Sequence, residues 1–232
     1  MAARSNHGYW AYLVPYFVFL VLVERGAPLP LKVAVPLVIL LYFAWNGAYP
    51  ELRNRPWRFS TTLADVAIGV LGAVLWMAPY VLLPSLRPEP GGEFDARQLG
   101  ADHIGLALTL RAIGFGVVTP FLEELFIRSW LPRFVDVFDT RRDFRKVPIG
   151  RFSARSFVVV VVMFTFSHVR WEWPVAFAWV LLTQWWFYRR QDVMALVVVH
   201  ASSNLAIFIA VLLASGRWTG PDGSVIDLWF FL

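Results

Sequence analysis

Long apolar runs recur along this 232-residue chain and constrain its fold more than any other feature. Seven runs are candidate membrane spans: Tyr9–Val23, Pro30–Trp45, Leu63–Leu83, Ile104–Val135, Phe157–Phe166 with its flanks, Trp173–Tyr188 and Val193–Leu213. A helix needs about 20 apolar residues to cross a bilayer, and in lipid it must satisfy its backbone hydrogen bonds internally. The sequence therefore predicts an all-α bundle of seven or eight transmembrane helices.

The composition is that of a polytopic membrane protein. Hydrophobic residues make up 58% of the chain and charged residues 16%, and the mean hydropathy is +0.58. Soluble domains average about 45–50% apolar and about 25% charged residues. Because the spans use most of the chain, we expect residues 1–232 to form a single transmembrane domain. The absence of cysteine excludes disulfides, cysteine-ligated zinc and a thiol nucleophile.

Basic residues gather in the loops between the apolar runs. Six basic residues and one acidic residue lie from Arg141 to Arg155, three arginines and one glutamate lie in Glu51–Arg58, and Arg189-Arg190 follows the sixth run. Seven spans would put these loops on one side, which is the cytoplasmic side by the positive-inside rule. The net charge of +5 is explained by this topology. We expect an integral membrane protein with a cytoplasmic N-terminus and no nucleic-acid partner.

The fourth run, Ile104–Val135, is too long for one simple span and contains Gly114 and Pro120. Proline and glycine are common at helix breaks and kinks, so we expect this run to be broken or kinked. Thr119 followed by Pro120 is typical of a helix start. Glu123 would then lie in the first turn of a half-helix, where the helix dipole favours a carboxylate.

Two carboxylates and a guanidinium lie inside this run, in Glu123-Glu124-Leu125-Phe126-Ile127-Arg128. Each charge at mid-membrane costs roughly 2.5–3.5 kcal/mol even on insertion-based scales, so these charges require partners. On a helix Glu124 and Arg128 share one face and can pair, whereas Glu123 points in another direction. A carboxylate without a pairing cation is suited to act as a general base. The alternative is that both glutamates are interfacial charges.

Two later runs also contain polar residues, in Phe164-Thr165-Phe166-Ser167-His168 and in His200-Ala201-Ser202-Ser203-Asn204. At 1.5 Å per residue, Glu123 lies roughly 18 Å, His168 roughly 16 Å, His200 roughly 10 Å and Asn204 roughly 16 Å from the cytoplasmic end of its span. We therefore expect these four residues to converge in one polar cavity at mid-depth. Taken singly, each could instead be a hydrogen-bonded helix-packing residue.

Together the three polar stretches resemble the CAAX prenyl protease and bacteriocin-processing (CPBP, Abi) family of intramembrane proteases. The motifs of that family are Glu-Glu-x-x-x-Arg, Phe-x-x-x-His and His-x-x-x-Asn/Asp on successive transmembrane helices, and residues 104–213 match every motif position. The resemblance implies that Glu124 and Arg128 support the catalytic helix. The chain is also similar in length and N-terminal spans to the bacterial CAAX prenyl protease-related branch, which implies a bacterial inner membrane.

The resemblance further implies an endopeptidase that cleaves a membrane-associated or lipidated protein substrate. By analogy, Glu123 and His168 would bind and activate a water molecule, while His200 and Asn204 would stabilise the oxyanion. Such a division suits the chemistry, because hydrolysis needs a base for the water and preorganised donors where negative charge develops.

Two alternatives remain open at this point. Members of the family have been described as metalloproteases, and Glu123, His168 and His200 could bind zinc with an open position for water. We favour a metal-free mechanism, because two metal-bound histidines would leave only Asn204 as an oxyanion donor. The other alternative is a non-catalytic scaffold or transporter that binds a peptide or partner in the same cavity.

Overall fold

The computed structural model describes residues 8–53, 58–89, 91–217, 219, 223 and 225–232, and within these residues the chain is all-helical. Its main helices are α1 (Trp10–Glu24), α2 (Leu29–Trp45), α3 (Phe59–Leu82), a continuous helix formed by α4 (Ile104–Ile113), α5 (Thr119–Glu124) and α6 (Leu131–Val135) with the segments between them, α7 (Ala154–Phe166), α8 (Trp173–Arg190) and α9 (Val193–Ala214). The predicted all-α bundle is confirmed.

The helices differ in whether they can cross a bilayer on length alone. The helices Phe59–Leu82, Ala101–Val135 and Val193–Ala214 are long and apolar enough to do so. The apolar helices α1, α2 and α7 are shorter, with 10 to 17 residues. The chain is an integral membrane protein in which shorter apolar helices pack beside three helices long enough to span a membrane.

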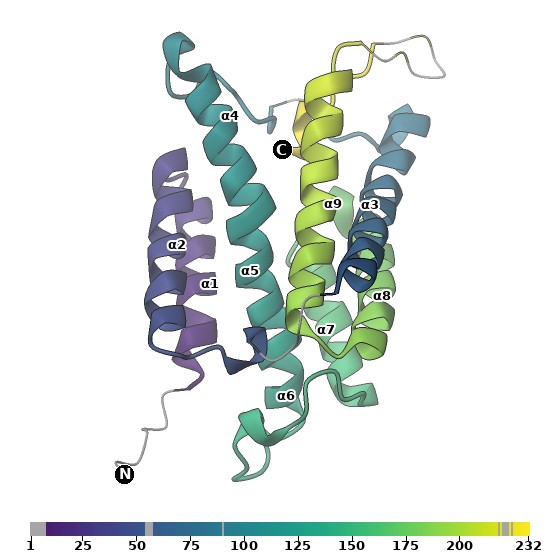
Figure 1. The fold of residues 1–232 in the computed structure, drawn as a ribbon. Coiled ribbons are helices and arrows are strands. Elements are labelled where there is room, and N and C mark those ends of the chain that lie inside the picture. The colour runs from purple at the N-terminus through teal and green to yellow at the C-terminus, as the bar shows by residue number, and fades with distance from the viewer. Residues whose placement is uncertain (1–7, 54–57, 90, 218, 220–222, 224) are drawn as a thin grey trace.

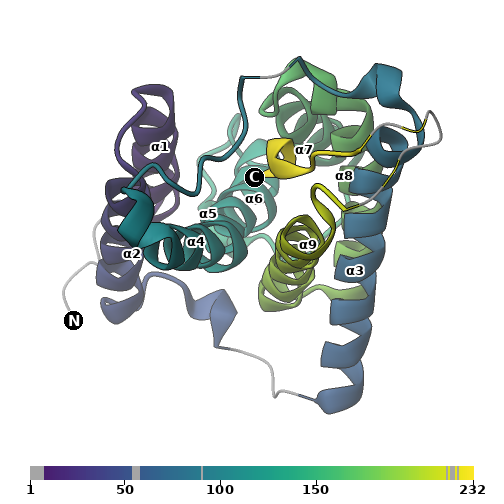
Figure 2. The same cartoon turned by 90° about the horizontal axis from the view of Figure 1, so that it is seen from above.

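The long α4–α6 helix separates two groups of helices (Figure 1). The α1–α2 hairpin lies on one side, and α3, α7, α8 and α9 lie on the other (Figure 2). Within the second group, α3 packs along α9 and α7 packs along α8. The central helix therefore contacts both groups, so its side chains can meet residues from either one.

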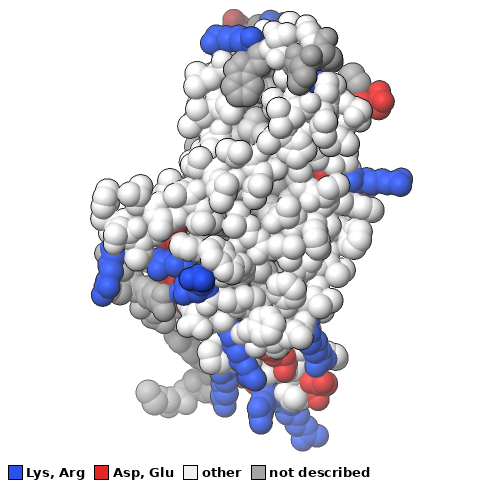
Figure 3. Space-filling view, turned by 90° about the vertical axis from the view of Figure 1, so that its right-hand side faces the viewer, with Lys and Arg blue, Asp and Glu red and all other residues white. Residues whose placement is uncertain are grey.

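The three basic loops lie at one end of the molecule. The connections from α2 to α3, from α6 to α7 and from α8 to α9 are all at the lower end in Figure 1, and the last residue lies toward the opposite end. Lysine and arginine side chains gather at that lower end (Figure 3). We call it the basic end. Residues 54–57 of the first of these loops, which include Arg55, lie outside the described residues.

The helix start predicted at Thr119-Pro120 is wrong, although the run is irregular, as expected. Thr119 has helical dihedral angles (φ −57°, ψ −48°), and the helix continues through it without a side-chain cap. Two π-helical segments, Gly114–Val118 and Leu125–Trp130, interrupt the α-helical pattern instead. Such wide turns can accommodate a proline without ending the helix. Glu123 therefore lies in mid-helix, and the argument from a half-helix dipole does not apply.

Small residues allow α9 to approach its neighbours closely. A Cβ atom on Gly69 of α3 would lie 2.3 Å from the Val199 carbonyl oxygen, and one on Gly116 would lie 2.4 Å from Leu205. Close backbone approach through glycine is typical of helix packing in membranes. These two contacts hold α9 between α3 and the central helix, which places His200 beside the charged stretch of the central helix.

The apolar segment at residues 226–232, for which the sequence indicated no role, folds back onto the bundle. Ile226 and Leu228 are buried against α3 and α9. Arg111 donates a hydrogen bond to the main-chain oxygen of Leu232, and its guanidinium lies 5.0 Å from the centre of the Phe115 ring. The segment thus covers the end of the bundle opposite to the basic end.

A buried polar cluster joins α1, the α2–α3 loop and the central helix near the basic end. Glu51 accepts hydrogen bonds from the Tyr12 hydroxyl (2.8 Å) and from the Ser129 hydroxyl, and it forms a 3.2 Å ion pair with Arg133. The side chains of Glu51 and Arg133 are only 5% and 7% exposed. An ion pair this deeply buried strongly penalises the loss of one partner.

We expect Glu51→Ala to destabilise the fold by about 3–5 kcal/mol, because it leaves the Arg133 guanidinium buried without its carboxylate. Asp139→Ala is the matched control, since Asp139 pairs with Arg155 at 3.1 Å but both side chains are about half exposed. That control should cost no more than about 1 kcal/mol. Unfolding in mixed dodecyl maltoside and sodium dodecyl sulfate micelles measures the free energy of unfolding of both variants. Equal losses of stability would contradict a structural role for the buried ion pair.

Candidate active site

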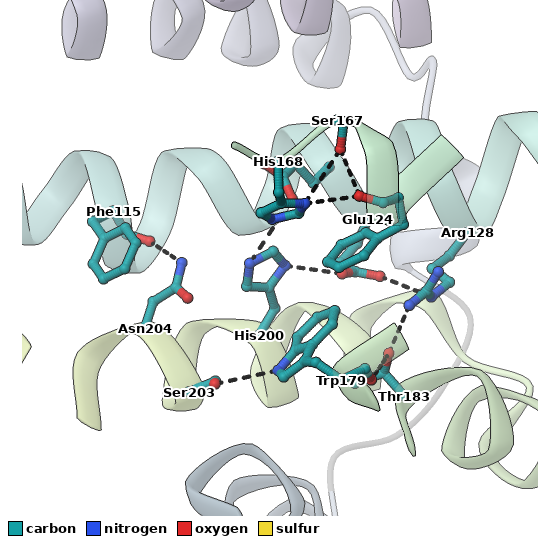
Figure 4. A network of polar contacts seen from close by, with 12 residues as sticks. Phe115, Glu124, Arg128, Ser167, His168, Trp179, Thr183, His200, Ser203 and Asn204 are labelled. Carbon is teal, nitrogen blue, oxygen red and sulfur yellow. Dashed lines mark hydrogen bonds and ion pairs between the residues drawn. The ribbon is translucent and has the colours of Figure 1, made fainter. Parts of the chain in front are cut away.

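Glu124 is the central charged group of the site. Its Oε1 lies 2.9 Å from His200 Nδ1, and its Oε2 lies 3.5 Å from Arg128 Nε, an ion pair without hydrogen-bond geometry. Arg128 Nη2 also donates to the Thr183 hydroxyl at 2.7 Å. Figure 4 shows the Glu124 carboxylate between the imidazole and the guanidinium. Glu124 thus joins the central helix to α9, while Arg128 joins it to α8.

Glu123 is the freer of the two carboxylates. Its side chain is 18% exposed, compared with 1% for Glu124, and its Oε2 lies 4.0 Å from His200 Nε2. The two glutamates therefore face the two different nitrogens of one imidazole. As expected from their positions on a helix, Glu123 does not share the contact between Glu124 and Arg128.

His168 lies on the same side of the site, just after the end of α7. Its Nδ1 is 2.7 Å from the Phe164 carbonyl oxygen, so Nδ1 carries the proton and Nε2 is left to interact with other groups. His168 also lies within electrostatic range of Glu123 and His200. The Trp76 ring packs against it with 5.3 Å between centroids. The structure therefore brings His168 to the same site as both glutamates.

Asn204 lies one turn beyond His200 on α9. Its Nδ2 donates to the Phe115 carbonyl oxygen at 2.7 Å. Phe115 belongs to the π-helical segment Gly114–Val118, in which a main-chain carbonyl is free to accept a bond from outside the helix. The amide of Asn204 has a second N–H that can bind another acceptor.

The structure also gives a role to Phe164, the phenylalanine of the second motif. Phe164 stacks on Trp179 with ring centroids 4.9 Å apart and an angle of 11° between the planes. The Arg128 guanidinium lies 5.8 Å from the centre of the Phe164 ring. The Trp179 ring is 4.9 Å from His200, and its indole N–H donates to Ser203 at 3.3 Å. Phe164 and Trp179 together form an apolar wall around the charged groups.

Several of these residues were not predicted from the sequence. Trp179 and Thr183 lie on α8, which carries no motif, and nothing in their local sequence distinguishes them. Tyr16 of α1 is buried, stacks on Phe126 with 4.2 Å between ring centroids, and lies within electrostatic range of Glu123. The sequence feature that could have indicated Trp179, Thr183 and Tyr16 is that each is a polar or amphipathic residue within a predicted span.

Glu172 is a further acidic group near the site, in the short turn between α7 and α8. Burial raises the pKa of its carboxyl to about 7, and the negative charge of Glu123 contributes to this increase. A carboxyl group with such a pKa is partly protonated near neutral pH, so it adds less negative charge beside Glu123 than an ordinary glutamate would.

The residues do not form an evident metal site. In residues 8–53, 58–89 and 91–217 and the described positions beyond them, no three His, Cys, Asp or Glu side chains are arranged to hold a metal ion. The contact between His200 Nδ1 and Glu124 resembles the carboxylate support that metal-bound histidines often have, but it also supports an imidazole that binds no metal.

We expect Arg128→Ala to destabilise the protein by about 3–5 kcal/mol, because it removes the guanidinium from a fully buried ion pair. Glu123→Gln should cost less than about 1 kcal/mol, since the amide has the same size and no lysine or arginine among the described residues pairs with Glu123. Thermal unfolding in detergent compares the two variants. If Glu123→Gln were the more destabilising change, the structural role assigned to Glu124 would belong to Glu123 instead.

The motif-bearing part of the chain is similar to a known protein family. Residues 105–206 match the family model described as type II CAAX prenyl endopeptidase Rce1-like. No curated protein and no solved structure matches the chain. The matched range contains all three motifs and extends from α4 into α9, whereas α1 to α3 lie outside it. The match implies a membrane protease that acts on protein substrates, and it does not distinguish the bacterial branch from others.

The family resemblance predicted from the three motifs is therefore confirmed. Residues 105–206 of this integral membrane protein belong to the Rce1-like family of type II CAAX prenyl endopeptidases.

Proposed function

We propose that the protein hydrolyses a peptide bond of a membrane-associated or lipidated protein, with a water molecule activated by Glu123. The observation that supports this most is the 4.0 Å separation between Glu123 Oε2 and His200 Nε2. This is too long for a direct hydrogen bond but shorter than two hydrogen bonds of about 2.8 Å laid end to end. A single oxygen atom of water or substrate can therefore contact both groups.

Glu123 is better suited than Glu124 to be the general base. Glu124 is engaged on both sides by His200 and Arg128, and its side chain is fully buried. A carboxylate engaged on both sides has no oxygen atom directed at a water molecule or a substrate. Glu123 is partly exposed and has no lysine or arginine among its described partners. We assign base catalysis to Glu123 and a supporting role to Glu124.

His168 is placed to hold the water molecule together with Glu123. Because its Nδ1 donates to the Phe164 carbonyl, its Nε2 can accept a hydrogen bond in the neutral tautomer. A water molecule that donates one proton to Glu123 and the other to His168 has its lone pairs directed elsewhere. Such a water molecule is oriented for attack on a substrate carbonyl.

His200 and Asn204 are the proposed oxyanion donors. Since Glu124 accepts the Nδ1 proton of His200, Nε2 can donate only when the imidazole is positively charged. Glu123 and Glu124 face the two nitrogens of that ring. Asn204 supplies its second N–H while the first stays on the Phe115 carbonyl. Each preorganised donor is typically worth about 2.7–4 kcal/mol in the transition state.

The proposed reaction balances with these residues alone. The water oxygen forms a bond to the peptide carbonyl carbon, and its proton moves to Glu123. The carbonyl oxygen becomes an oxyanion, which His200 and Asn204 bind. When the C–N bond breaks, the leaving nitrogen takes the proton from Glu123, and the carboxylate base is restored.

The charge distribution supports one orientation in the membrane. We propose that the basic end faces the cytoplasm, because all three basic loops gather there. The N-terminus would then be cytoplasmic. The resemblance to the bacterial branch supports the inner membrane of a bacterium as the location of the protein.

We expect Glu123→Gln to lower the rate of peptide hydrolysis by at least about 10²-fold, because the amide keeps the size of the side chain but cannot accept the water proton. The assay incubates purified protein in lipid with a library of membrane peptides and identifies products by mass spectrometry. Asp139→Ala, at an exposed position of the α6–α7 loop, is the activity control. A Glu123→Gln rate within threefold of wild type would refute the assignment.

A separate prediction concerns metal. We expect the purified protein to be active without zinc, and His200→Ala to lower chiefly kcat, because an oxyanion donor acts mainly in the transition state. Elemental analysis combined with chelation and re-addition of Zn²⁺ tests this. Stoichiometric zinc, with activity that disappears on its removal and returns with it, would establish the metalloprotease alternative.

A further inference from the structure

A cavity near the basic end lies apart from the candidate active site. It has a volume of about 520 Å³ and is formed by the start of α1, the end of α6 and the turn that follows α6. Pockets for small molecules usually have about 300–1,000 Å³, so this cavity is large enough for a ligand. We call it the α6 cavity.

Positive charge dominates one wall of the α6 cavity. Arg141, Arg142 and Arg145 line it, and Asp143 is its one acidic residue. Arg145 pairs with Asp143 at 2.6 Å, and this guanidinium lowers the pKa of the Asp143 carboxyl, which therefore stays ionised. Arg141 and Arg142 have no ion-pair partner in the part of the chain that the structure describes. Two guanidinium groups are thus available to an anion.

Aromatic side chains form the other wall. Tyr9, Phe134 and Phe138 line the cavity, and each is more than a third exposed. Phe134 lies in the last turn of the motif-bearing helix, where the apolar span is followed by the basic loop. Exposed aromatic rings at this depth are typical of the boundary between acyl chains and head groups. The cavity therefore joins an apolar wall to a cationic one.

Local hydrogen bonds hold the turn that carries the arginines. The Thr140 hydroxyl accepts a bond from the Arg142 main-chain N–H at 3.1 Å and donates to the Val137 carbonyl at 2.8 Å. Asp143 caps the next short helix by accepting from the Arg145 main-chain N–H. The backbone of the cationic wall is thus fixed before any ligand binds, which lowers the entropic cost of binding.

We propose that the α6 cavity binds the head group of an anionic phospholipid. The phosphate would lie between Arg141 and Arg142, and the upper part of an acyl chain would lie along Phe134 and Phe138. An acidic protein segment would match the arginines equally well, but it would not use an exposed aromatic wall at the level of the acyl chains. Basic pockets beside transmembrane helices on the cytoplasmic side are suited to such lipids.

A bound lipid would act on the same continuous helix that carries Glu123 and Arg128. The cavity is built on the end of α6, and the helix runs without a break from α4 to Val135. A lipid that fixes this end would stabilise the orientation of the central helix. The inference concerns lipid binding and stands whether or not the protein is a peptidase.

The test compares two lipids that share their acyl chains and differ in head-group charge. Purified protein in detergent is titrated with dioleoyl phosphatidylglycerol or dioleoyl phosphatidylcholine, and native mass spectrometry counts the lipids retained. We expect wild type to retain one phosphatidylglycerol at concentrations where phosphatidylcholine is released. The affinity of the double variant Arg141→Gln/Arg142→Gln for phosphatidylglycerol should be lower by at least about tenfold, because the variant lacks both unpaired charges.

Arg151→Gln/Arg189→Gln is the matched control, because Arg151 of the α6–α7 loop and Arg189 of the last turn of α8 are exposed at the basic end but lie outside the α6 cavity. This variant has the same net charge as the first, and it should bind like wild type. A second arm titrates an acidic peptide without lipid. Equal losses of lipid affinity in both double variants would show non-specific attraction to the basic surface. Equal retention of both lipids by wild type would exclude recognition of the head group. Tight binding of the acidic peptide, without selective binding of phosphatidylglycerol, would identify a protein ligand. Each of these three results would overturn the proposal.

Discussion

The contact of the Glu124 carboxylate with Arg128 and His200 is the interaction on which the arrangement of this membrane protein depends. All three side chains are buried where ordinary charges would be costly. They persist because each provides the countercharge or hydrogen bond that the others need. The same contact joins the central helix to α9, and the bond from Arg128 to Thr183 adds α8. One polar cluster therefore orients three helices and fixes the rotation of each about its axis.

Apolar packing alone would not specify that orientation in lipid, because lipid tails solvate apolar side chains as well as neighbouring helices do. Close approach is provided instead by small residues such as Gly69 and Gly116, which lie against Val199 and Leu205 of α9. The two π-helical segments adjust the central helix so that its carbonyls and side chains meet α9. The Phe115 carbonyl, which accepts the bond from Asn204, belongs to one of these segments.

Two adjacent glutamates have different surroundings, and this difference underlies the proposed chemistry. Glu124 is enclosed by partners, whereas Glu123 faces the open side of the site toward His168 and the other nitrogen of His200. Environment separates a structural carboxylate from a basic one in many enzymes with paired acids. Here the imidazole of His200 lies between the two glutamates. Glu124 accepts the proton of Nδ1 and so sets the tautomer, whereas Glu123 faces Nε2, the nitrogen that the proposed chemistry uses.

The sequence by itself determined the helical class, the helix limits to within a few residues and the family, because hydropathy and three spaced motifs are local properties of the chain. It also indicated that Glu123, His168, His200 and Asn204 lie at similar depth, since helix rise is fixed. Only the tertiary structure decided that Glu124 contacts His200, because that bond joins residues 76 positions apart. The continuity of the helix at Thr119-Pro120 was likewise decided by tertiary packing, which overrode the local signal for a helix start.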